Sequence, residues 1–119
     1  MDRWQAIDSF WNSFGIPAYD ENSVPDDVGF PYITYEARTS GFEDPIDLHA
    51  SIWYRSTSWK DISNKSDEIY NTVYPSFSRP IDGGYLYIYP GSPFAQRMNE
   101  PGDENTRRIY ILINAEFMI

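Results

Sequence analysis

The fold is decided by Ile52-Trp53-Tyr54-Arg55-Ser56-Thr57-Ser58-Trp59-Lys60-Asp61, where a strand pattern changes into a helix pattern. Upstream, over residues 46–55, apolar side chains recur at every second position, as in a half-buried strand. Downstream, apolar side chains recur at helical spacing from residue 59 to residue 73. Ser58 is placed to accept a hydrogen bond from a free amide of the first helical turn, and Asp61 lies where the helix dipole favours an anion. The stretch therefore predicts a strand that leads into a helix with almost no loop.

The segments before this stretch predict a helix and a hairpin. Apolar residues three or four apart predict a helix from Asp2 to about Phe14, and capping-box spacing marks its start. Residues 15–31 contain several prolines and acids and are expected to form a long loop. The alternating segment Tyr32–Arg38 should then pair with residues 46–55 through a turn around Gly41 to Pro45.

The segments after the stretch predict a helix and a second hairpin. The helix should run from Ser58 to about Tyr74, because Pro75 cannot continue it. The remaining elements are expected in this order: a polar, proline-bearing segment over 75–84, a strand over Tyr85–Tyr89 ended by Pro90-Gly91-Ser92-Pro93, a short helical turn over Phe94–Arg97, an acidic loop over Glu100–Asn105 and a strand over Arg107–Phe117.

The predicted order is helix, hairpin, helix, hairpin. It predicts an α+β fold with a mostly antiparallel four-stranded sheet and both helices on one face. The length of 119 residues fits a single domain spanning 1–119.

Composition excludes several classes of protein. There are no cysteines, so disulfides, thiolate metal sites and cysteine nucleophiles are excluded. No apolar run reaches the about 20 residues of a membrane span, and residues 1–4 show no signal-peptide pattern. The net charge of −9 opposes tight duplex binding, although an acidic wall lets DNA slide past without sticking.

The strand alternation predicts two sheet faces of different character. One face collects the aliphatic residues that the helices should cover. The opposite face is rich in tyrosine and tryptophan, residue types that are enriched at protein interfaces. The alternative is a solvated face whose tyrosines only stabilise cross-strand pairs. The residues that we expect at a subunit or partner interface are Trp53, Arg55, Tyr85, Tyr87, Tyr89 and Tyr110.

Candidate chemistry is sparse. His49 is the only histidine and lies on the same strand face as Asp47, a pair that could orient a general base. No serine stands in a nucleophile-elbow context, and the acidic loop at residues 100–105 lacks the ligand spacing of a calcium loop. We expect no catalytic residues, no cofactor and no metal, and therefore no enzyme.

Several segments resemble one family. Five segments resemble the tail terminator, or tail-to-head joining, proteins of long-tailed bacteriophages: Ile52–Lys60, Gly83–Ile88, Gly91–Gln96, Arg107–Tyr110 and Ala115–Phe117. The resemblance covers residues 32–119 and implies an α+β fold without enzyme activity. It also implies a homo-oligomeric, hexameric ring that caps the tail tube and docks the neck of the head.

The resemblance further implies partners and a location. The partners would be copies of the chain, the major tail tube protein and a head-completion protein, with DNA passing through the lumen unbound. The location would be the tail and neck of the virion, and the host cytoplasm during assembly. The acidic residues expected to line the lumen or to face a partner are Asp20, Glu21, Asp26, Asp27, Glu100, Asp103 and Glu104.

Two alternatives remain open. The protein could be a different neck component, such as a head-completion stopper or a minor tail protein. It could also be a small ligand-binding or enzymatic α+β domain that uses the aromatic face as a pocket, with His49 and Asp47 as polar anchors.

Overall fold

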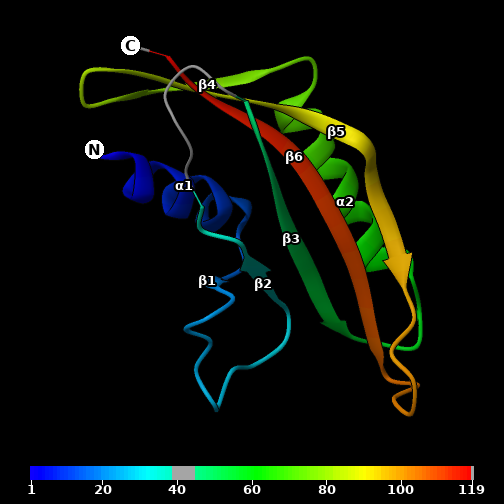
Figure 1. Cartoon of the computed structure of the whole chain (residues 1–119). Helices are drawn as coiled ribbons and strands as arrows, with labels where there is room; N and C mark the ends of the chain where they lie inside the picture. The colour runs from blue at the N-terminus through cyan, green and yellow to red at the C-terminus, as the bar shows by residue number, and fades with distance from the viewer. Residues whose placement is uncertain (39–44, 119) are drawn as a thin grey trace.

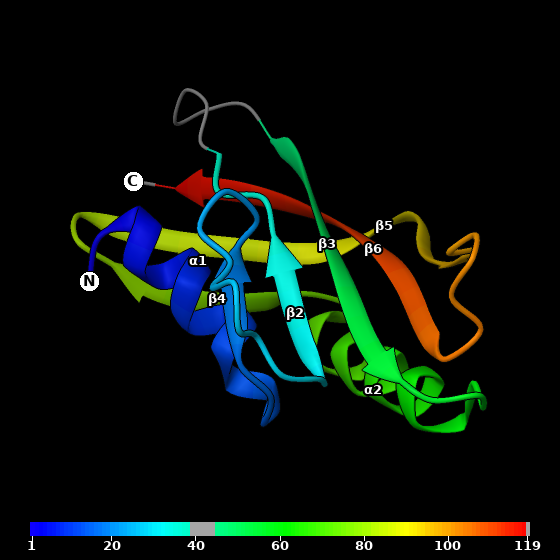
Figure 2. The ribbon, with the colours of Figure 1, turned by 90° about the horizontal axis from the view of Figure 1, so that it is seen from below.

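The computed structural model describes residues 1–38 and 45–118. The elements are α1 (Arg3–Trp11), a 3-10 turn η1 (Asn12–Phe14), β1 (Ala18–Asp20), β2 (Tyr32–Tyr35), β3 (Ile46–Arg55), α2 (Lys60–Val73), β4 (Phe77–Ile81), β5 (Gly84–Met98) and β6 (Thr106–Met118). The strands form one mixed sheet of six strands in the order β1-β2-β3-β6-β5-β4. Only β1 and β2 run parallel, and every other neighbouring pair is antiparallel. The sheet curls like half a barrel, and α2 lies along its inner face (Figures 1 and 2).

The predicted four-stranded antiparallel sheet with helix, hairpin, helix, hairpin order is wrong, because each half of the chain contributes an additional strand. The first addition, β1, lies within the expected loop 15–31 and pairs in parallel with β2. The second, β4, lies within the expected polar segment 75–84 and pairs with β5. Both form the sheet edges, where a strand of three residues or a strand containing Pro80 is tolerated.

The third predicted strand is also corrected, because β5 continues through the prolines to Met98 instead of ending at Tyr89. Its register against β6 shifts between Pro90 and Ala95, so the extra residues form a bulge. The expected helical turn at residues 94–97 is strand instead. A bulge accepts proline because some of its residues are not required to donate to the ladder.

The deciding stretch agrees with expectation in its strand, whereas the helix begins two residues after the predicted Ser58, and its N-cap residue, Trp59, forms no side-chain capping bond. Strand β3 has the predicted bounds. The Ser58 hydroxyl oxygen accepts a hydrogen bond from the Lys60 amide at 3.1 Å, and α2 begins at Lys60. Strand β2 ends at Tyr35, earlier than expected, and residues 39–44 of the predicted turn lie outside the described residues.

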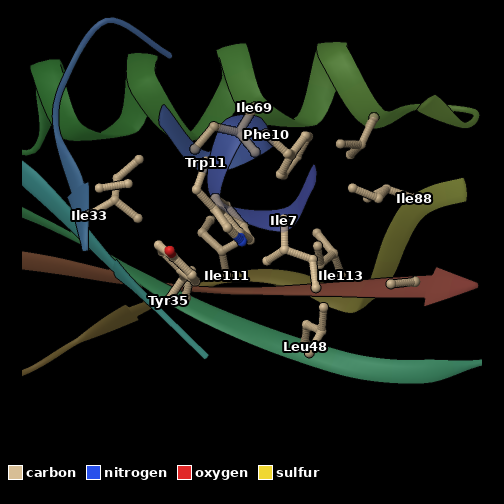
Figure 3. Close-up of a cluster of buried hydrophobic side chains, with 14 of the residues drawn as sticks. Ile7, Phe10, Trp11, Ile33, Tyr35, Leu48, Ile69, Ile88, Ile111 and Ile113 are labelled. Atoms are coloured by element: carbon tan, nitrogen blue, oxygen red, sulfur yellow. The ribbon is translucent and has the colours of Figure 1, made fainter. Parts of the chain in front are cut away.

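Both helices pack on the aliphatic face of the sheet. Figure 3 shows Phe10, Trp11 and Ile69 from the helices facing strand residues such as Leu48 and Ile111. The aliphatic residues predicted for this face are buried, and Ala37 is partly buried. Of the aromatic residues predicted to face the core, Tyr54 and Trp59 are only partly buried, and Trp4 and Tyr70 are exposed. The Tyr35 hydroxyl donates a hydrogen bond of 2.5 Å to the Asp8 carboxylate, and burial raises the pKa of Tyr35. The opposite, convex face is therefore the one left for other contacts.

Candidate functional site

A continuous row of aromatic rings and guanidinium groups crosses one end of the convex face. Tyr32 and Trp53 are cross-strand partners and stack with ring centroids 6.0 Å apart. Arg108, the partner of Trp53 on β6, lies 4.8 Å over the indole centroid. At the other end, Phe30 lies 5.2 Å from the Tyr32 ring, and Arg55 lies 4.6 Å over Phe30. We call Arg55, Phe30, Tyr32, Trp53 and Arg108 the aromatic–arginine row.

Hydrogen bonds hold the row in place. The Trp53 indole N–H donates to the Thr34 hydroxyl at 2.9 Å. Arg108 donates through Nε to the Ser51 hydroxyl at 3.0 Å and through Nη1 to Glu100 at 3.3 Å. A side chain already ordered in the free protein loses less entropy on binding. The row is therefore preorganised for contact with a partner.

The six residues expected at an interface share the convex face but form two groups. Trp53 and Arg55 belong to the row, and Tyr110 stacks on the His49 ring at 5.5 Å nearby. The second group, Tyr85, Tyr87 and Tyr89, lies towards the opposite end of the sheet along β5. Tyr85 is 52% exposed and pairs with Met118, which is 46% exposed.

The acids predicted after β1 differ in their surroundings. Asp20 accepts a hydrogen bond from the Asn22 amide at 2.9 Å, which forms a local turn. Glu21 lies 3.2 Å from the His49 ring. Asp26 and Asp27 are exposed in the segment between β1 and β2. Glu21 is exposed as well but lies beside His49, whereas no ion pair or hydrogen bond of the Asp26 and Asp27 carboxylates is seen among the described residues.

The acids predicted in the β5–β6 loop are largely engaged with the row. Glu100 pairs with Arg108 at 3.3 Å, and Asp103 lies 3.8 Å from Arg55. The Thr106 hydroxyl, helped by backbone amides, donates to Asp103 and holds the pKa of that carboxyl below its ordinary value. Glu104 is exposed. This loop therefore partly neutralises the arginines of the row.

Three members of the row were missed by the sequence reasoning. Tyr32 lies two residues before Thr34 and Arg108 two before Tyr110, so the alternation already places both on the convex face. Phe30 precedes β2 and carries no periodic signal. Only the fold shows that it lies under Arg55.

The Asp47–His49 pair of the alternative enzymatic reading is replaced by a different arrangement. The His49 ring lies between Glu21 and Glu36, at 3.2 Å and 3.5 Å. Asp47 instead contributes its backbone carbonyl, which accepts a hydrogen bond from Arg38. His49 and Asp47 therefore do not form a common polar anchor.

A cavity of about 550 Å³ lies between the β5–β6 loop and the β3–α2 junction. Its lining includes Trp59, with Arg107 5.2 Å over the indole, and the acids of the loop. Arg97 lies 4.8 Å over the same indole. The lining thus combines both signs of charge with one aromatic ring, and it does not include the aromatic sheet face that the alternative pocket would use.

No protein-family model matches this chain, and no curated protein matches it significantly. Neither α1 nor α2 combines the length and the apolar character of a membrane-crossing helix.

Proposed function

We propose that this protein is a structural subunit of a bacteriophage virion, which forms a ring that caps the finished tail tube and joins it to the neck of the head. The observation that carries the proposal is the aromatic–arginine row on a sheet face that α1 and α2 leave uncovered. Tryptophan, tyrosine and arginine dominate the energetics of protein interfaces. A preorganised row of these residues is well suited to a protein partner.

The family resemblance supports the same assignment through its segments rather than through strand order. The resembling segments form the β3–α2 junction, the start of β5, the bulge and the two ends of β6. These segments contain Trp53, Arg55 and Arg108 of the row and Tyr85 of the second group. Because the predicted strand order is wrong, topology gives the proposal no support, and its support comes from these segments and from the convex face.

The charge of the chain is compatible with a ring around DNA. The formal net charge is −9, so a lumen lined by such subunits repels phosphates and lets DNA slide. The exposed Asp26, Asp27 and Glu104 are the predicted acids best placed for a lumen, because the carboxylates of Glu21, Glu100 and Asp103 have partners within the chain.

A head-to-tail ring also needs two different surfaces on each subunit. The aromatic–arginine row offers one, with the Arg55 side chain 54% exposed. The group Tyr85 and Met118 at the far end of the convex face offers a second, apolar one. We propose that the tail tube contacts the row.

Native mass spectrometry and negative-stain imaging with purified tail tubes test the proposal. The wild-type chain should form rings at the ends of the tubes, whether the rings also form in free solution or assemble only on the tube. Trp53→Ala and Arg55→Ala should each weaken tube binding about tenfold or more, since truncation of a central interface residue has effects of that size. Tyr74→Ala is the matched control, because Tyr74 is 60% exposed on a different surface.

Three results would contradict the proposal or its details. A strictly monomeric chain that fails to bind tubes would refute it. Equal binding by Trp53→Ala, Arg55→Ala and the wild type would remove the row from the interface. Virions made without this protein should have overlong or headless tails, and tails of normal length would favour a different neck component.

A further inference from the structure

A second cluster on the convex face brings together three potential metal ligands. Glu21 follows β1, Glu36 follows β2, and His49 lies on β3. One ligand atom from each residue lies within 4.8 Å of the other two. These residues are 13 or more positions apart in the sequence, so the pairing of three strands creates the cluster.

The backbone of the sheet holds all three residues in position. The Glu21 amide donates to the Tyr35 carbonyl at 2.9 Å, and the Glu36 amide donates to the His49 carbonyl at 2.9 Å. The His49 ring stacks on Tyr110 at 5.5 Å, with 25° between the ring planes. The donor atoms therefore start from rigid elements, as a binding site requires.

The ion pairs of the cluster contain more carboxylates than guanidinium groups. Two carboxylates lie beside one imidazole. The Glu36 Oε2 atom lies 3.5 Å from His49 Nδ1, and the Glu36 Oε1 atom lies 3.6 Å from Arg38 Nε. That oxygen is buried and has no hydrogen-bond partner among the described residues. Arg38 offsets one of the two negative charges of the cluster, and a bound cation would offset the other.

We propose that Glu21, Glu36 and His49 bind a divalent transition-metal ion, with Zn²⁺ as the best match. Ligands bound to one zinc ion at about 2.1 Å lie at most about 4.2 Å apart, so the donor atoms of the cluster must move closer together and one carboxylate must turn. Glu21 faces Nε2 of the ring and Glu36 faces Nδ1, so one carboxylate rotates towards the nitrogen that takes the metal. One imidazole with two carboxylates suits zinc better than Ca²⁺ or Mg²⁺, which prefer all-oxygen sites.

The ion would attach the segment after β1 to the middle of the sheet. Glu21 begins the connection to β2, which carries Asp26, Asp27 and Phe30. Binding at Glu21 would restrain this connection at its start and steady the end of the row that Phe30 occupies. The inference is independent of the proposed function, because it concerns the isolated chain.

Isothermal titration with ZnCl₂ tests the site on the full chain, free of affinity tags and treated with EDTA. We expect one Zn²⁺ per chain. His49→Gln and Glu36→Gln should each weaken binding about tenfold or more, since losses of that size follow even changes around metal ligands. Asp26→Asn, an equal charge change at an exposed position of the same segment, should leave binding unchanged.

Two further measurements keep the test decisive if a variant folds poorly. In the wild-type chain, zinc should slow amide hydrogen exchange over residues 21–31, and Ca²⁺ or Mg²⁺ should not. Co²⁺ should give the visible absorption of a nitrogen- and oxygen-ligated site. No zinc binding by the wild type, equal binding by His49→Gln, or equal effects of Ca²⁺ and Zn²⁺ would each overturn the proposal.

Discussion

Replacing Gly91 by alanine should destabilise the protein through a contact within the β5 bulge. A Cβ atom at position 91 would lie 2.6 Å from Leu112 Cγ, 2.9 Å from Leu112 Cδ2 and 2.8 Å from the Leu112 carbonyl oxygen. All three distances are shorter than real Cβ contacts. The added methyl group therefore forces either Leu112 or the backbone of β6 to move.

The magnitude depends on how far Leu112 can shift. The side chain is only half-buried and can change its rotamer, but the carbonyl belongs to β6, which is paired to β3 on one side and to β5 on the other. Overpacking of this kind costs about 1–3 kcal/mol. We expect about 2 kcal/mol for Gly91→Ala because a backbone atom is involved. For a domain of this size the melting temperature should fall by about 6–10 °C.

Urea unfolding followed by circular dichroism measures the change in the free energy of unfolding. Gly29→Ala is the matched control, because a Cβ at Gly29 meets nothing within 4 Å. It should be neutral or stabilise the fold by up to about 1 kcal/mol. The double variant Gly91→Ala/Leu112→Ala should lose less stability than the sum of the two single variants, since two of the three close contacts are with the Leu112 side chain.

The reasoning would be refuted if Gly91→Ala unfolded at the same urea concentration as the wild type. It would also be refuted if the double variant showed simple additivity, because the clash would then not involve the Leu112 side chain.

The remaining predictions concern the core and the pH dependence of stability. Phe10→Ala should lower the free energy of unfolding by about 3–5 kcal/mol, because Phe10 is fully buried. Trp4→Ala, at a half-exposed position, should change the free energy of unfolding by less than about 1 kcal/mol, and urea unfolding compares the two variants. Burial raises the pKa of Tyr54, so the neutral phenol stabilises the fold below about pH 10, and this stabilisation is lost as the pH rises further. Thermal melts from about pH 8 to 11 should show a smaller fall in melting temperature for Tyr54→Phe than for the wild type, and equal falls would contradict this. The hydrogen bond from Thr106 lowers the pKa of Asp103, so the ionised carboxylate stabilises the fold above about pH 4, and this stabilisation is lost as the pH falls through the lowered value. Asp103→Asn should therefore make stability depend less on pH in the acid range, and an unchanged acid dependence would argue against this.

Sequence reasoning found the elements whose patterns are long and regular. Strand β3 and the start of β6 were predicted within a residue of their bounds because their alternation extends over ten or more positions. The three residues of β1 are too few to show a period, and Pro80 argues against a strand unless it lies at an edge. The prediction therefore omitted both edges of the sheet.

The candidate site was predictable to a similar extent. Alternation placed Trp53, Arg55 and Tyr110 on one face, and the same rule extends to Tyr32 and Arg108. It could not show that Phe30 lies beneath Arg55, or that Glu21 reaches His49, because those contacts depend on connections between strands.

The sequence by itself determined which side chains of β3 and β6 face the helices and where β3 leads into α2. Both properties depend on neighbours a few positions apart, within reach of local periodicity and capping. Only the tertiary structure decided the parallel pairing of β1, the continuation of β5 through its bulge, and the meeting of Glu21, Glu36 and His49. Strand register sets these features, and register arises from the packing of the whole sheet around one core.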